Sequence, residues 1–152
     1  MAFTHMAFGF LAGMLFFPVF RHHWFVFIPL CVLGSLLPDV DHENSKINKL
    51  FPVTKWVPKL FTHRGFFHTI FPVILIYLLF HFLKADVIGV PLAVGYVSHL
   101  FSDGLTESGI NFLHPVSKLH LSGFIRTNSF MEFVLFGVVL CFGFLLVLKR
   151  LF

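Results

Sequence analysis

The chain is organised around Pro38-Asp39-Val40-Asp41-His42, a stretch that places three metal-binding side chains directly after an apolar segment. Pro38 disfavours continuation of a helix, so the residues after it can fold back over the end of that segment. Two carboxylates and an imidazole supply the oxygen and nitrogen donors that Zn2+ and Mn2+ accept. A solvated acidic turn is the alternative interpretation, since Asp is favoured in turns. No second histidine follows four residues after His42, which disfavours the paired-histidine metalloprotease motif.

The sequence on both sides of this stretch has the composition of a membrane protein. Of the 152 residues, 57% are hydrophobic and only 12% are charged, and the mean hydropathy is +0.89, far from the values of soluble domains. Apolar runs cover residues 8–20, 24–37, 66–83, 87–101 and 130–148. The last run is long enough to cross a hydrocarbon core of about 30 Å, whereas the first two are short. We therefore predict an all-α membrane bundle of about five helices in one domain, residues 1–152, with four full crossings as the alternative.

The N-terminus, the cysteines and the basic residues exclude several classes of protein. We expect no cleavable signal peptide, because no basic region precedes the first apolar run. Cys31 and Cys141 stand alone in apolar runs, which predicts two small buried hydrophobes and neither a disulfide nor a metal pair. The sequence pI is about 9.3, but the basic residues flank apolar runs, which indicates membrane topology and not nucleic-acid binding.

Five crossings would divide the basic residues unequally between the two sides of the membrane. The side that carries the N-terminus and residues 38–65 and 104–129 holds seven: Lys46, Lys49, Lys55, Lys59, Arg64, Lys118 and Arg126. The other side holds four: Arg21, Lys84, Lys149 and Arg150. This excess favours the cytoplasm for the first side. The lysines at 46–59 are interspersed with Phe51 and Trp56, as in segments that lie on anionic headgroups.

Further ligand-capable residues fall on that same side. His99 and Asp103 are four residues apart, so they share one face of a helix. An ionised Asp in an apolar helix costs several kcal/mol unless it is paired or ligated. His63 and His68 converge with Arg64 if Gly65 marks a turn before the third apolar helix, and a guanidinium there could bind a phosphate or carboxylate.

Two more residues complete the predicted site. His5 lies near the start of the first helix, and Glu132 lies one turn into the last helix, behind a predicted Ser129 cap. In an antiparallel bundle these helix ends meet, which predicts one shared metal site. The remaining side of the bundle carries His22, His23 and His81, which we interpret as interfacial anchors, and a turn with Lys84 and Asp86.

His5 and four sequence blocks resemble the signature of the YdjM-like family of inner-membrane metal-dependent hydrolases. The blocks are LLPDVDH (36–42), THRGFFHT (62–69), GYVSHLFSDGLTESGI (95–110) and SFME (129–132). The resemblance covers nearly the whole chain, although Glu107 stands where the family usually has proline. It implies a metal site at His5, Asp39, Asp41, His42, His63, His68, His99, Asp103 and Glu132. A more distant similarity to zinc-dependent phospholipase C implies several zinc ions held by scattered His, Asp and Glu residues.

Nine ligand-capable groups exceed what one tetrahedral ion needs, so we expect two or more Zn2+ ions, with Mn2+ as the alternative. The expected core ligands are His42, Asp41, His99 and Asp103, with His5, His63 and His68 completing the shell. Asp39 or Glu132 is expected to bridge ions or to act as general base, and Arg64 to bind the anionic substrate.

These expectations describe a hydrolase of the inner (cytoplasmic) membrane that uses a metal-activated water. The expected substrate is a lipid or another membrane-associated phosphate ester, and amide hydrolysis at a lipid headgroup is a variant of the same chemistry. Two other classes stay open: a non-catalytic, metal-stabilised regulatory or interaction protein, and a metal transporter or sensor. A transporter predicts polar groups along the whole length of the helices.

Overall fold

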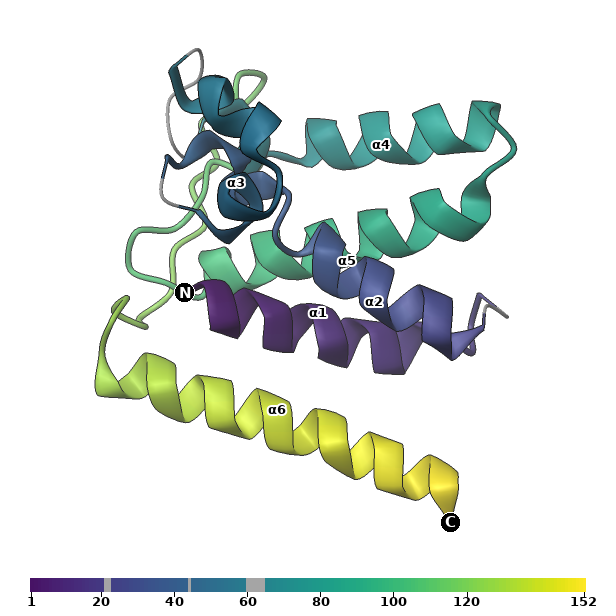
Figure 1. Ribbon diagram of the computed structural model, residues 1–152. Coiled ribbons are helices and arrows are strands. Elements are labelled where there is room, and N and C mark those ends of the chain that lie inside the picture. Colours follow the sequence, from purple (N-terminus) through teal and green to yellow (C-terminus); the bar gives the residue numbers. More distant parts are fainter. Residues whose placement is uncertain (21–22, 44, 60–64) are drawn as a thin grey trace.

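The computed structural model describes residues 1–20, 23–43, 45–59 and 65–152, and it is all-α as predicted (Figure 1). Its α-helices are α1 (Ala2–Phe16), α2 (Trp24–Gly34), α3 (Lys46–Leu50), α4 (Ile70–Phe82), α5 (Asp86–Gly104) and α6 (Phe130–Leu151). Short 3-10 helices η1 (Pro38–Asp41), η2 (Pro52–Lys59) and η3 (Phe66–His68) lie in the connections. Within these residues, extended pairing is limited to isolated bridges between Thr106 and Ile125 and between Ile110 and Leu121.

Each of the five apolar runs overlaps one long helix, but the helix bounds differ from those of the runs. Helix α1 begins at Ala2 and ends at Phe16. Pro18 lacks the amide hydrogen that would continue the helical hydrogen bonds. Helix α4 begins only at Ile70, after Thr69 caps it by accepting a hydrogen bond from the Phe71 amide. Segments Trp24–Asp41 and Phe130–Arg150 are long and apolar enough to cross a membrane, whereas α1 and α4 are shorter.

The five long helices run antiparallel, so their connections collect at two opposite ends (Figure 1). At one end α1, α4 and α6 begin and α2 and α5 finish, and residues 38–43, 45–59, 65–69 and 105–129 lie there. We call this end the site end. Helices α1, α2 and α5 pack against one another, while α4 packs on α5 and α6 packs on α1.

Glycine allows α2 and α5 to approach closely. A Cβ atom on Gly95 would overlap the Cys31 carbonyl, and one on Gly34 would overlap the Leu92 carbonyl. The predicted burial of Cys31 is confirmed, since it is fully buried in this contact. The same prediction is wrong for Cys141, which is exposed because α6 contacts the bundle through one side only. The close contact fixes the last turn of α2 against the ligand-bearing part of α5.

Candidate metal centre

Six ligand-capable side chains meet at the site end of the bundle. His5 comes from α1, Asp39 and Asp41 from η1, His68 from η3, and His99 and Asp103 from the last turns of α5. All except the half-buried Asp39 are at most 2% exposed. Two groups in this set have ligand atoms within 4.8 Å of one another, namely His68, His99 and Asp103, and His5, Asp39 and His99. The structure therefore contains buried His/Asp groups that could hold a metal ion.

The first group has the dimensions of a metal site. The Nε2 atoms of His68 and His99 are 3.4 Å apart, and Asp103 Oδ2 lies 3.5 Å from His68 Nε2 and 3.7 Å from His99 Nε2. A tetrahedral Zn2+ with bonds of about 2.0–2.1 Å separates its ligand atoms by roughly 3.3–3.4 Å. The three atoms thus form a slightly enlarged face of such a tetrahedron.

The proton position on His99 follows from its hydrogen bond to the end of α2. His99 Nδ1 lies 2.7 Å from the Ser35 carbonyl oxygen, which can only accept a hydrogen bond. Nδ1 therefore donates, and Nε2 of the neutral ring keeps its lone pair toward His68 and Asp103. A ligating histidine typically uses its second nitrogen in this way, to fix ring orientation and tautomer.

A hydrogen bond through Nδ1 orients the His5 ring as well. Its Nδ1 lies 2.7 Å from Ser102 Oγ, and the Ser102 hydroxyl donates its proton to the His99 carbonyl oxygen at 2.8 Å. Ser102 Oγ must then accept from His5 Nδ1, which leaves the His5 Nε2 lone pair facing Asp103 Oδ1 at 3.5 Å. The two oxygens of Asp103 consequently face different histidines.

Asp41 lies beside the outer nitrogen of His68, the side that faces away from His99 and Asp103. Its Oδ2 lies 3.3 Å from His68 Nδ1, and both side chains are fully buried. A carboxylate on the outer nitrogen of a histidine raises the basicity of the nitrogen that faces the metal. Asp41 is therefore placed to orient His68 from behind.

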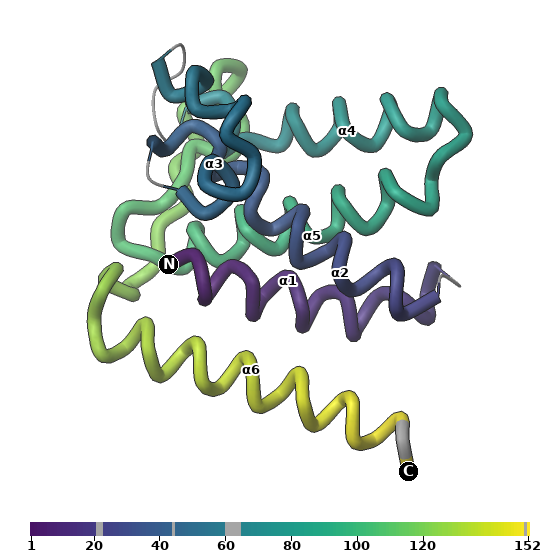
Figure 2. The backbone as a smooth tube through the Cα atoms, viewed as in Figure 1, coloured from purple at the N-terminus to yellow at the C-terminus, as the bar shows by residue number. Residues whose placement is uncertain are grey.

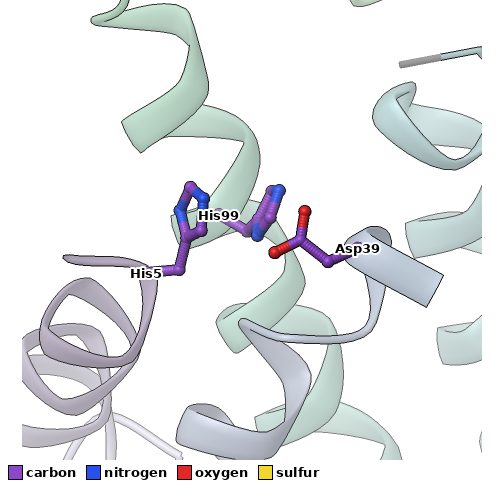
Figure 3. Close-up of side chains that lie close together, drawn as sticks. All are labelled: His5, Asp39 and His99. Carbon is purple, nitrogen blue, oxygen red and sulfur yellow. The ribbon is translucent and has the colours of Figure 1, made fainter. Parts of the chain in front are cut away.

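The second group extends the cluster toward η1. Figure 3 shows the rings of His5 and His99 side by side and the Asp39 carboxylate directed toward His99. The two rings are stacked, with centroids 3.9 Å apart and planes 26° apart. Because His99 donates through Nδ1 to Ser35, it has one nitrogen for a metal, and both groups share that atom.

Electrostatics explain why these residues fit a cation. The Nε2 atoms of His68 and His99 face each other, and all three Nε2 atoms face an oxygen of Asp103, across 3.4–3.7 Å. A proton or a metal cation between such buried nitrogen and oxygen atoms would stabilise their close approach. Imidazole and carboxylate are donors that Zn2+ and Mn2+ accept. The cluster thus has the donor set and the spacing for a divalent metal.

Five residues of the predicted site are not part of the two groups. Asp41, expected as a core ligand, lies behind His68 instead. His42 is exposed, because the chain leaves η1 in an extended conformation at this residue. Glu132 uses both carboxylate oxygens elsewhere: Oε1 contacts Thr4 Oγ1 and the Met1 amino group, each at 2.8 Å, and Oε2 accepts from the Asn128 amide. His63 and Arg64 lie outside the described residues, so their expected roles stay predictions.

Asn48 supports the site although the sequence analysis did not identify it. Its buried side chain donates to the carbonyl oxygens of Val40, at 3.0 Å, and His42, at 2.9 Å. Its Oδ1 atom accepts from Thr54 Oγ1 at 2.6 Å. Asn48 therefore holds the turn that carries Asp39 and Asp41. The position of Ser102 between two ligands was a signal for its role, whereas nothing in the sequence around Asn48 indicated one.

Sequence comparisons relate the chain to bacterial membrane proteins. The profile of the family described as YdjM inner membrane protein matches residues 1–151. The uncharacterized protein YvsG of Bacillus subtilis is 36% identical over 112 residues, which are 71% of this chain and 70% of YvsG. The inner membrane proteins YdjM of Escherichia coli and Shigella flexneri are each 33% identical over 100 residues, 60% of this chain and 50% of their own length. No solved structure matches the chain significantly.

Proposed function

The chain belongs to the YdjM inner membrane protein family, and we propose that it is a multi-pass membrane hydrolase that uses divalent metal ions. The observation that carries this proposal is the triangle of His68 Nε2, His99 Nε2 and Asp103 Oδ2, with edges of 3.4, 3.5 and 3.7 Å. Three protein ligands with a further open position are typical of catalytic zinc sites, whereas structural sites use four.

We assign two ions to the cluster, both Zn2+ or, as the alternative, Mn2+. His68, His99 and Asp103 would hold the first, and His5 and Asp39 would hold the second, beside the His99 that the two groups share. Support comes from Asp103, whose oxygens lie 3.5 Å from His5 Nε2 on one side and 3.5 Å from His68 Nε2 on the other. Asp103 would then be the residue that serves both ions, a role for which the sequence suggested Asp39 or Glu132.

The metal ions and the surrounding residues would have different roles in hydrolysis. The chemistry that two divalent ions supply in such sites is activation of water and stabilisation of charge on the leaving oxygen. Ser102 and the Ser35 carbonyl would hold His5 and His99 in the tautomer that presents Nε2. The Asp41 carboxylate, 3.3 Å from His68 Nδ1, would favour the same tautomer of His68. Asp39 is the least buried member of the cluster, so its carboxylate is the candidate general base at the edge of the site.

The proposed substrate is a phosphate ester of a lipid or another membrane-associated molecule. The cluster lies where the apolar helices begin and end, the depth at which lipid headgroups are found. The adjoining segment carries exposed lysines, which favour an anionic substrate. The excess of basic residues at the site end favours the cytoplasmic face of the inner membrane.

Burial of the ligands favours a second candidate, a non-catalytic protein in which the metal only joins helix ends. Five of the six side chains are at most 2% exposed, as expected for a closed structural site. A metal transporter has less support: the buried polar residues of the described chain lie in the site-end half of the helices and in the loops there.

The test measures metal content and hydrolysis on the same detergent-purified samples. Wild type is compared with Asp103→Asn and with the control Asp86→Asn, which alters an exposed Asp–His pair at the opposite end of the bundle. Elemental analysis gives metal per chain, and release of phosphate or phosphorylated headgroups from bacterial phospholipids gives activity. We expect about two ions per chain, with metal and activity lost together in Asp103→Asn only. Bound metal without turnover would favour the structural alternative, and failure of wild type to bind metal would refute the site.

A further inference from the structure

The segment formed by α3 and η2 presents an unusual outer surface at the site end. Its exposed residues combine apolar side chains with ammonium groups, and we call it the α3–η2 surface: Lys49, Leu50, Val53, Lys55, Trp56 and Lys59. Val53 is 74% exposed, Leu50 61% and Trp56 58%. Large apolar side chains held this far out of a fold usually mark a contact with a partner or a membrane.

Exposure along η2 follows the three-residue repeat of a 3-10 helix. Thr54 and Val57 are half-buried and form the inner side, where Thr54 donates to Asn48. Val53, Trp56 and Lys59 are exposed and share one outer side. The fold thus fixes which side chains point outward, and Trp56 lies one 3-10 turn from Lys59.

The charge of the surface is of one sign. Residues 44–85 contain no Asp or Glu, so no carboxylate of this part of the chain can neutralise the lysines. Lys46 is not counted in the surface, because its ammonium group lies over the Phe3 ring, 3.2 Å from the centroid. Lys49, Lys55 and Lys59 are exposed and are available to an anionic partner.

The surface has a fixed position relative to the apolar helices. Asn48 bonds α3 to the turn at Val40 and His42, and η2 packs against η1. Figure 2 follows the chain through this region at the end of the bundle where α4 starts. The surface therefore lies beyond the ends of α2 and α4, at the level that the headgroups of a surrounding bilayer would occupy.

We propose that the α3–η2 surface binds the anionic headgroups of the bilayer in which the apolar helices are embedded, with Trp56 in the interface. Tryptophan is enriched at this depth because its ring is amphipathic. Lysines bind anionic headgroups through charge, while their aliphatic stems cover apolar surface. This contact does not depend on hydrolysis, so it stands or falls separately from the proposed enzyme activity.

Trp56 can report on the contact in the full-length protein. The chain has two tryptophans, so Trp24→Phe leaves Trp56 as the only one. The variant is placed in nanodiscs of phosphatidylcholine with an increasing fraction of phosphatidylglycerol. We expect the Trp56 emission to shift to the blue and to be quenched by lipid brominated near the glycerol as that fraction rises. High salt should reverse the effect, because screening weakens the attraction.

Matched charge variants test the role of the lysines. Lys55→Ala/Lys59→Ala, made in the Trp24→Phe background, should lower the apparent affinity for phosphatidylglycerol roughly 30-fold, since each lysine contributes about fivefold. The control Lys84→Asn/Lys149→Ala removes two charges at the opposite end and should leave the Trp56 signal unchanged. Asn is used at 84 because that residue has φ of 55°, which Asn tolerates.

Three results would overturn the proposal. The first is identical Trp56 emission and quenching in neutral and anionic nanodiscs. The second is an equal response of the two charge variants. The third is a shift of the same size in neutral nanodiscs on addition of soluble glycerol phosphate, which would assign the surface to a free anion.

Discussion

Replacing Asp41 by Asn tests whether the carboxylate behind His68 orients the metal site. Asp41 Oδ2 lies 3.3 Å from His68 Nδ1, and both groups are buried. Asn keeps the shape but removes the charge, and its amide can turn an N–H toward Nδ1. The ring would then keep its proton on Nε2, the atom that faces Asp103. Loss of such an outer partner typically weakens metal binding about 10–100-fold, which corresponds to about 1.4–2.7 kcal/mol.

The assay is competition for Zn2+ with a coloured chelator in detergent, on wild type, Asp41→Asn and Asp86→Asn. The last is a matched control, because Asp86 Oδ1 lies 3.0 Å from His81 Nδ1 on the exposed opposite end. Circular dichroism of the metal-free proteins checks that helix content is equal. Wild-type affinity in Asp41→Asn, or an equal loss in Asp86→Asn, would refute the reasoning that Asp41 acts through His68.

Three further predictions concern the frame around the cluster. Asn48→Ala should lower the free energy of unfolding by roughly 1–3 kcal/mol, because it removes two hydrogen bonds to the partly buried carbonyl groups of Val40 and His42. In thermal unfolding, the control Asn111→Ala, at an exposed residue, should change stability by less than about 0.5 kcal/mol. Equal effects of the two variants would contradict the argument. Gly95→Ala should cost about 1–3 kcal/mol by forcing α2 from α5. A Cβ atom at Gly137 would have no other atom within 4 Å, so the control Gly137→Ala should leave stability unchanged or raise it. Chemical denaturation measures the stability of both glycine variants. Glu132→Gln should keep its metal by elemental analysis while weakening the α1–α6 contact, so loss of metal would return this residue to the ligand set.

The fold could be predicted from the sequence because apolar runs in a membrane protein leave few choices. Five runs gave five long helices, and Pro18 and Thr69 set two of the ends that hydropathy alone missed. The same reasoning could not find that α6 packs mainly on α1 and leaves Cys141 exposed. Packing partners depend on close contacts such as that of Gly95 with Cys31, and hydropathy does not report those contacts.

Helical spacing placed His99 and Asp103 together, whereas in the connection after α2 it could not separate Asp39, which reaches the cluster, from His42, which does not. His99 and Asp103 are one turn apart on α5, so their convergence follows from helix geometry. Asp39 and His42 are only three residues apart, yet η1 ends between them and directs His42 outward. The Ser35 carbonyl could not be found at all, because every residue has one and only the packing of α2 on α5 selects this one.

The contact between Ser35 and His99 links the metal cluster to the packing of the bundle. The last carbonyl groups of a helix have no partner within that helix, and the imidazole of α5 satisfies one of them at the end of α2. The bond that completes α2 is thus the bond that turns His99 Nε2 toward Asp103. In a mostly apolar bundle such polar partners are scarce, so the helix ends and the ligand set depend on the same few groups. This dependence explains why ligands from four separate elements converge only where α1, α2 and α5 pack together.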